Sequence, residues 1–343
     1  MKREIFEDAL TEIREDYILE AAMAKKPVRK RVGILLMAAI LFALTLAVNA
    51  AAPVGLDFYL RAVFGDGYTM LDEMTAMPEH VAYRASGDEL RLELNGIVGD
   101  SQVVYVFADI TVAAEYVPPE GSIYSIAAMI EPMGFAWNRD GSHSASASGM
   151  EPILHEDGSA TYPTVFKLTS GGGVLRGKYV ISCTGVRIWD MEKKEHIPIC
   201  EGRWNLAFTL NYPDLTVREA VSAEGVIALE SFENPDESVE LPLVQVYEIC
   251  RSPVSVGIYF TTTPDFNMKM GMGLTKEATL RFDDGTALYW KDRSAENLVT
   301  GADISCSSEG EDAKGCILLT FDEPIDADTL ASITVGGLTI PLK

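Results

Sequence analysis

The chain has 343 residues, and 48% of them are hydrophobic, which is enough for about two domains with packed cores and argues against general disorder. Its formal net charge of −23 would repel a phosphate backbone, so nucleic acid is not expected as a partner. Residues 1–31 hold eight of the 28 Lys/Arg and seven of the 51 Asp/Glu, and residues 32–52 hold none of either. The acidity therefore belongs to the long C-terminal part, which keeps 20 basic and 44 acidic residues.

Residues 4–24 have the pattern of an amphipathic helix. Phe6, Leu10, Ile13 and Tyr17 recur at spacings of four, three and four, which places them on one helix face among acidic neighbours. An isolated helix of this length is only marginally stable in water, and its acidity does not suit an anionic membrane surface. The helix should therefore dock on another protein or self-associate. We expect these four residues to bind a partner in the cytoplasm.

Residues 32–52 are expected to form a transmembrane helix. At about 1.5 Å per residue this uncharged apolar stretch spans roughly the 30 Å hydrocarbon core of a bilayer. The basic residues next to it all precede it, so the N-terminus is predicted to be cytoplasmic and the rest extracytoplasmic. The alternative is a signal peptide cleaved before Ala51, after the small residues Val48 and Ala50. The residues expected to set the topology are Lys25, Lys26, Arg29, Lys30 and Arg31.

Residues 53–83 are predicted to be a membrane-proximal connector, with one helix over 56–64 ended by Gly65 and a second over 68–77 before Pro78. From about residue 84 the hydrophobic pattern has period two, as in Leu90, Leu92 and Leu94, and later in Trp204, Leu206, Phe208 and Leu210. Short alternating segments separated by turn residues are typical of β-sandwiches. The fold class is therefore mainly β: one N-terminal transmembrane helix followed by two β-sandwich modules, over residues 84–212 and 213–343.

Turn signals refine the two modules. Asp284-Gly285 predicts a hairpin between strands at 279–282 and 287–290, and Gly336-Gly337 predicts a second one inside 333–340. Further strands are expected at 254–260 and 317–321. Residues 118–163, which are rich in Gly and Ser around 140–149, are predicted to be a long surface loop.

Several motifs partly match known phosphate- or metal-binding sites. Residues 172–179 match the first seven positions of a phosphate-binding loop, but Tyr179 replaces the required Ser/Thr and a strand pattern follows, so a hairpin turn is the better interpretation. Met268, Met270 and Met272 alternate in a way that suits Cu(I), although flexible methionines also fill irregular cores. Asp283-Asp284-Gly285 lacks the later ligands of a calcium loop. The four histidines have no metal-site spacing, so no metal, no cofactor and no enzyme activity are predicted.

The five cysteines, Cys183, Cys200, Cys250, Cys306 and Cys316, have no zinc-site spacing. Outside the cytoplasm a disulfide between Cys306 and Cys316, facing each other across a hairpin, is one interpretation. Buried thiols are the other, and the sequence leaves both open.

Four stretches together resemble a family of anti-sigma-factor-like single-pass membrane proteins of Gram-positive bacteria. They are residues 9–22 (ALTEIREDYILEAA), the basic cluster with the span after it, residues 58–68 with 92–111, and residues 331–342 (ASITVGGLTIPL). The resemblance implies an immunoglobulin-like C-terminal module and a role in transmembrane signalling, with an extracytoplasmic-function sigma factor as the cytoplasmic partner. Residues 1–31 have room for one helix rather than the usual helical bundle, and they lack the His/Cys zinc pattern of many such factors.

The leading functional hypothesis is a membrane-anchored extracytoplasmic sensor or regulator in the cell membrane. Its β-rich part would bind an unknown envelope ligand, and its N-terminal helix would contact a sigma factor or another cytoplasmic regulator. The alternative is a surface-tethered, non-catalytic binding or adhesion module whose tail only sets the topology.

Overall fold

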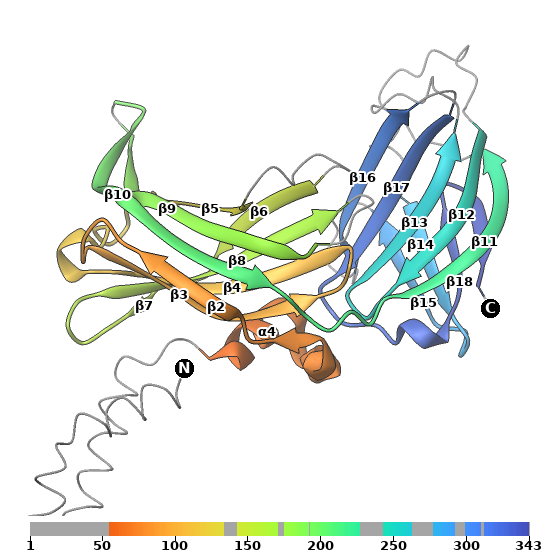
Figure 1. The fold of residues 1–343 in the computed structure, drawn as a ribbon, viewed down its shortest axis with the longest axis horizontal. Coiled ribbons are helices and arrows are strands. Elements are labelled where there is room, and N and C mark those ends of the chain that lie inside the picture. Colours follow the sequence, from red (N-terminus) through yellow and green to blue (C-terminus); the bar gives the residue numbers. More distant parts are fainter. Residues whose placement is uncertain are drawn as a thin grey trace, which may run out of the picture. The chain divides into compact units, whose positions relative to one another are not determined.

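The computed structural model describes residues 55–133, 143–170, 175–191, 193–226, 243–262, 277–291, 299–309 and 312–342. All of them belong to one compact unit, Pro53–Lys343. They are mainly β and form several antiparallel sheets, which is consistent with β-sandwich modules (Figure 1). No helix among these residues is long and apolar enough to cross a membrane. The predicted tail helix and the predicted span at 32–52 lie outside the described residues, so both stay predictions.

Two sheets make up what we call the first module. One has the order β1-β3-β4-β8-β6, with β7 also paired to β8, and the other has the order β2-β10-β9-β5. The first sheet contains β1 (Thr75–Ala76), β3 (Leu90–Gly99), β4 (Val103–Val112), β6 (His143–Gly149), β7 (Ile153–Leu154) and β8 (Ala160–Ser170). The second contains β2 (Glu79–Arg84), β5 (Tyr124–Pro132), β9 (Gly177–Asp190) and β10 (Glu195–Leu210).

One hydrophobic core joins the two sheets of the first module. It contains alternate residues of β3, including Leu90 and Leu92, and alternate residues of β10, including Trp204 and Phe208. Trp204 is fully buried, and its indole N–H donates a 3.0 Å hydrogen bond to the Gly87 carbonyl. The period-two prediction is confirmed for these strands, since every second side chain enters the core.

Two further sheets make up the second module, and they enclose a core of their own. Their orders are β11-β12-β13-β17-β16 and β15-β14-β18-β19. The first contains β11 (Val217–Val226), β12 (Leu243–Arg251), β13 (Ser255–Thr262), β16 (Val299–Glu309) and β17 (Asp312–Phe321). The second contains β14 (Glu277–Phe282), β15 (Ala287–Lys291), β18 (Leu330–Val335) and β19 (Leu338–Pro341). The chain passes from the sheets of the first module to those of the second between Leu210 and Val217.

Both predicted hairpins of the second module are present. β14 pairs with β15 around Gly285, whose φ is 85°, and the Asp284 carboxylate accepts bonds from the Thr286 N–H and hydroxyl at 2.8 and 2.6 Å. β18 turns into β19 at Gly336 and Gly337, with φ values of 51° and 89°. Two consecutive residues with positive φ are what a tight two-residue hairpin requires, and glycine adopts them without steric cost.

The helical segments are short. α4 (Leu56–Phe64) has the predicted bounds and ends at Gly65, whose φ of 60° is unfavourable for other residues. The predicted second helix over 68–77 is present over 68–74 as part of the 3₁₀ helix η1 (Gly65–Met74), but it ends earlier than predicted, because Thr75 and Ala76 pair with β3. Two further 3₁₀ turns are η2 (Ala114–Tyr116) and η4 (Ala327–Thr329).

Two other predictions about the first module are corrected. Its strands begin before residue 84, because β1 and β2 lie inside the predicted connector and join the two sheets. The predicted loop over 118–163 contains β5, β6 and β7. The Ser/Ala-rich β6 has little intrinsic strand preference, and it is ordered by pairing with β8 in a register from His143 opposite Ser170 to Gly149 opposite Thr164.

Candidate functional site

The face of the first sheet that points away from the module core is covered by α4 and η1. Tyr59, Phe64 and Met74 of these segments are fully buried in a second cluster, against alternate β4 residues that include Tyr105 and Phe107. The rings of Phe64 and Tyr105 meet edge to face, with centroids 5.0 Å apart. β4 is therefore buried on both faces.

Tyr59 attaches α4 to β4 by hydrogen bonds inside this cluster. Its hydroxyl donates to the buried Asp109 carboxylate, and the Ala108 carbonyl lies 2.9 Å away. The Asn95 amide donates to the same hydroxyl at 3.4 Å. The pKa of Tyr59 is raised far above the ordinary tyrosine value, mainly by burial and to a smaller extent by the nearby Asp109 carboxylate. The phenol therefore stays protonated. α4 is therefore held on β4 both by aromatic packing and by the hydrogen bonds of the buried Tyr59 hydroxyl.

The turn between β3 and β4 contains a completely buried carboxylate, Asp100. One of its oxygens accepts bonds from the backbone N–H groups of Gln102 and Val103, at 2.7 and 2.8 Å. The other accepts from the hydroxyls of Ser252 and Ser255, which flank the β12–β13 turn of the second module; the Ser255 bond is 2.6 Å. Burial raises the pKa of Asp100, and these four bonds to the carboxylate oppose that rise.

Gln102 extends the same contact along β13. Its amide N–H₂ donates to the Tyr259 hydroxyl at 3.2 Å, and its carbonyl oxygen lies 3.3 Å from the Ser255 hydroxyl. A Cβ at Gly257 would overlap the Gln102 amide, so glycine at that position is needed for the close approach. Asp100, Gln102, Ser252, Ser255 and Tyr259 are together called the joint below.

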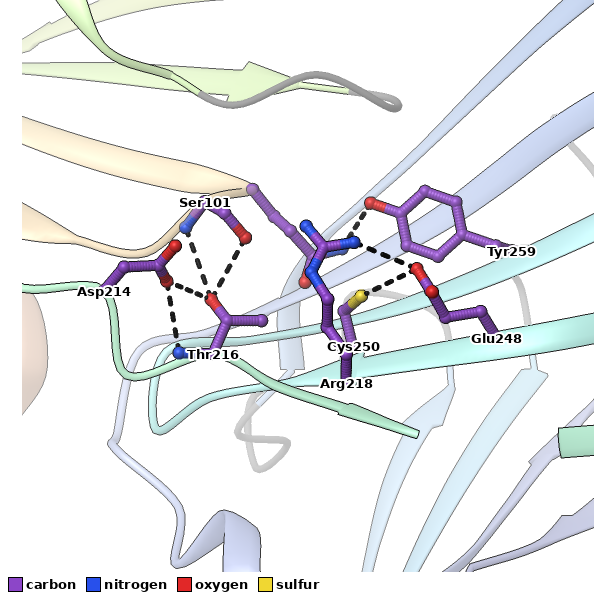
Figure 2. A network of polar contacts seen from close by, with 8 residues as sticks. Ser101, Asp214, Thr216, Arg218, Glu248, Cys250 and Tyr259 are labelled. Atoms are coloured by element: carbon purple, nitrogen blue, oxygen red, sulfur yellow. Dashed lines mark hydrogen bonds and ion pairs between the residues drawn. The ribbon is translucent and has the colours of Figure 1, made fainter. Parts of the chain in front are cut away.

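A second strip of polar contacts runs beside the joint (Figure 2). The Ser101 hydroxyl lies 3.1 Å from the Thr216 hydroxyl, which in turn donates to Asp214 at 2.5 Å. Arg218 and Glu248 form an ion pair at 3.0 Å on β11 and β12. The Cys250 thiol donates to the same Glu248 carboxylate at 3.4 Å, and burial raises its pKa.

The segments α4 and η1 also lie against residues of the second module. Val254, in the β12–β13 turn, is fully buried in the cluster that holds Tyr59 and Phe64. A Cβ at Gly67 of η1 would lie 3.2 Å from the Pro324 ring. On the other side of Tyr105, the Lys167 ammonium donates to the Thr320 hydroxyl at 2.8 Å. The segment that follows the predicted span is therefore packed against side chains of both modules.

A cavity of about 320 Å³ lies in the first module, where β5 and β6 end their respective sheets. Ile110 and Tyr162 are buried in its floor, whereas Tyr124 is 37% exposed. The rings of Tyr124 and Tyr162 meet edge to face with centroids 5.4 Å apart. The residues that line the cavity are Ile110, Tyr124, Ser125, Ile126, Ala128, Ala147, Gly149, Met150, Tyr162 and Thr164.

The described lining of the cavity is uncharged and partly polar. Burial and, to a smaller extent, the neighbouring Tyr124 raise the pKa of Tyr162 to about 12, so the Tyr162 phenol is neutral at physiological pH. Among the described residues, the hydroxyls of Tyr124, Ser125 and Tyr162 have no hydrogen-bond partner. Thr164 already donates to the Tyr162 carbonyl at 3.1 Å. Three hydroxyls thus stay available to a molecule in the cavity.

The predicted site residues lie mostly outside the described chain. Phe6, Leu10, Ile13, Tyr17 and the basic cluster at 25–31 do so, as do Met268, Met270 and Met272. His155 forms a 2.7 Å hydrogen bond with the Thr161 hydroxyl, and the ring of His196 packs edge to face on Trp189. Both contacts are structural. Within the described ranges, no group of three or more His, Cys, Asp or Glu side chains could hold a metal ion.

The predicted cysteine pairing does not fit the strand register. β16 and β17 form the expected hairpin, but Cys306 lies opposite Gly315, and Cys316 lies opposite Ser305. The two cysteines are therefore not directly opposite each other, because each lies one residue away from the residue that faces the other. Cys316 belongs instead to a small buried cluster with Cys250 and Tyr259. Cys183, Cys200 and Cys250 are buried thiols, as the alternative interpretation proposed.

Sequence reasoning missed both the joint and the cavity. Asp100 and Gln102 belong to none of the predicted motifs, and no local pattern links Asp100 to Ser252 and Ser255, which lie 152 and 155 positions away. Tyr124 and Tyr162 fell inside the predicted loop. The alternation of Ile126, Ala128 and Ile130 was a signal for β5 that the neighbouring Gly/Ser-rich stretch obscured.

No protein-family model and no curated protein matches this chain. A crystal structure of the conserved domain protein from Bacillus anthracis aligns with 82% of this chain and 84% of its own chain, with 13% sequence identity and a TM-score of 0.48.

Proposed function

We propose that this protein is a membrane-anchored extracytoplasmic sensor or regulator. In this proposal residues 32–52 span the membrane, the β modules bind a ligand in the envelope, and the face formed by Phe6, Leu10, Ile13 and Tyr17 contacts a cytoplasmic regulator. An extracytoplasmic-function sigma factor is the partner that the family resemblance suggests.

The observation that supports this proposal is the packing of α4. A tether that only holds a module at a surface needs no fixed structure next to the membrane. Here α4, the first described helix after the proposed span, buries Tyr59, Leu60 and Phe64 in a cluster that also contains Val254 of the second module. The joint then fixes the β3–β4 turn to the β12–β13 turn. A change in either module would therefore reach the segment that enters the membrane.

The proposed output can be tested in the full-length chain expressed in a Gram-positive host. Leu10→Asp with Ile13→Asp places two charges on the proposed docking face, where burial of each apolar side chain contributes about 1.5–3 kcal/mol. The double variant should lose the cross-link to its cytoplasmic partner and change transcription of the partner's genes, while it remains in the membrane fraction. Glu12→Gln, on the outer face, should keep both. If the double variant signals like the wild type, the tail is not a docking element.

The topology has its own test. Intact cells treated with external protease should lose epitopes placed in the β modules and keep an epitope at the N-terminus. A soluble protein that begins at Ala51 would instead support cleavage of a signal peptide.

A surface-tethered binding module is the second candidate, and the cavity between β5 and β6 is the observation that favours it. Ligand binding with no response from the tail would distinguish it from a sensor. For the C-terminal half we propose an immunoglobulin-like module. Its two antiparallel sheets of five and four strands around one core support this description.

A further inference from the structure

We propose that the cavity between β5 and β6 binds a neutral saccharide unit. The inference deepens the proposed function, because it names the class of ligand that the extracytoplasmic part would bind. It depends on the lining of the cavity and not on the behaviour of the N-terminal tail.

The size and location of the cavity suit a single ring. Its volume of about 320 Å³ is at the small end of ligand pockets, which run to about 300–1,000 Å³. The partly exposed Tyr124 lies at its mouth, and the buried Tyr162 and Ile110 form its floor. A ring that enters beside Tyr124 would place one face against aromatic carbon.

The chemistry of the lining selects an uncharged ligand with hydroxyl groups. A charged group would lose its hydration without a countercharge from the described lining, which is costly. A purely apolar ligand would leave the hydroxyls of Tyr124, Ser125 and Tyr162 without partners. A sugar ring has apolar C–H faces and hydroxyls along its edge, so it satisfies both parts of the wall.

The binding assay uses the purified full-length chain in a zwitterionic detergent that contains no sugar headgroup. The probes are glucose and N-acetylglucosamine, with glucuronate as a charged control and phenol as an aromatic control that has a single hydroxyl. Saturation-transfer NMR and calorimetric titration should detect the two neutral sugars and should show weaker or no binding of both controls.

Three variants locate the binding. Ala147→Phe, on β6, should fill the cavity and abolish sugar binding. Ser146→Phe is the matched control, since it adds the same ring at the adjacent residue, which does not line the cavity, and it should bind as the wild type does. Tyr162→Phe removes one hydroxyl and should weaken binding by about two- to tenfold, the effect of one net hydrogen bond.

Each outcome decides the proposal. Sugar binding that is lost in Ala147→Phe and kept in Ser146→Phe supports it. Absence of sugar binding, equal binding of glucuronate, preference for phenol, or binding that survives Ala147→Phe overturns it. Circular dichroism of each variant checks that the fold is intact. Because the tail variants leave the cavity unchanged, the proposed signalling role can fail while sugar binding holds, and the reverse is also true.

Discussion

The joint and the β5–β6 edge differ in how far their side chains are buried and hydrogen-bonded. At the joint, the β3–β4 turn is covered: Asp100 accepts four hydrogen bonds, and the adjacent β4 is buried on both faces. At the β5–β6 edge, the apolar side chains of Ile123 and Met129 are more than half exposed, and residues of both strands line a cavity. Buried, fully bonded polar groups fix one geometry, whereas an open edge leaves groups available to a ligand. Stability and binding are therefore expected to depend on different ends of the first module.

The largest effect is expected at α4, which packs against β4 next to the joint. Phe64→Ala removes a fully buried ring that packs on Tyr105, and substitutions of this kind cost about 3–5 kcal/mol. The loss should appear as undocking of α4, so trypsin should cut after Arg61 much faster than in the wild type. Phe58→Ala on the same helix, where the ring is 44% exposed, is the control and should change cleavage little. Equal cleavage of both variants would mean that α4 is not held by this cluster.

Asp100→Ala should cost about 3 kcal/mol, because it leaves two buried N–H groups and two buried serine hydroxyls without their acceptor. Calorimetry should then show the two modules unfolding in separate transitions. The control is Asp214→Ala, since Asp214 is exposed and caps only Thr216. A single transition with an unchanged midpoint in Asp100→Ala would show that the joint does not couple the modules.

Gly257→Ala should cost about 1–2 kcal/mol, a typical penalty for overpacking, because the new methyl group displaces the Gln102 amide from Tyr259. Chemical denaturation of the single variants and of the double variant with Gln102→Ala gives the coupling energy. Once Gln102 is truncated, the added methyl group should be almost harmless, so the two effects should be strongly non-additive. Additive costs would contradict a direct contact.

The smallest effect is expected at the open edge. Met129→Ser, at a side chain that is 53% exposed, should change the free energy of unfolding by less than about 0.5 kcal/mol. Denaturant midpoints of this variant and of Phe64→Ala provide the direct comparison between the two regions. A large loss of stability at Met129 would mean that the β5 edge is covered by another part of the protein.

Much of the β architecture was accessible from local sequence. The period-two runs at Leu90–Leu94 and Trp204–Leu210 identified core strands, because each alternate side chain must leave water. Gly285 and Gly336-Gly337 identified hairpins, since the turns require positive φ, and Gly65 ended α4 for a similar reason. These features depend on the backbone preferences of a few neighbouring residues, and such preferences can be inferred without knowledge of the rest of the chain.

The sequence by itself therefore determined the mainly β class and the principal strands and hairpins. Only the tertiary structure decided that β4 is buried on both faces, that the Ser/Ala segment of β6 is a strand, and that Cys306 and Cys316 are offset in register. It also brought Asp100 to Ser252 and Ser255, and Tyr124 to Tyr162. The physical reason is that these outcomes depend on which distant surfaces meet, and neither the hydrophobic period nor the turn chemistry of a segment carries that information.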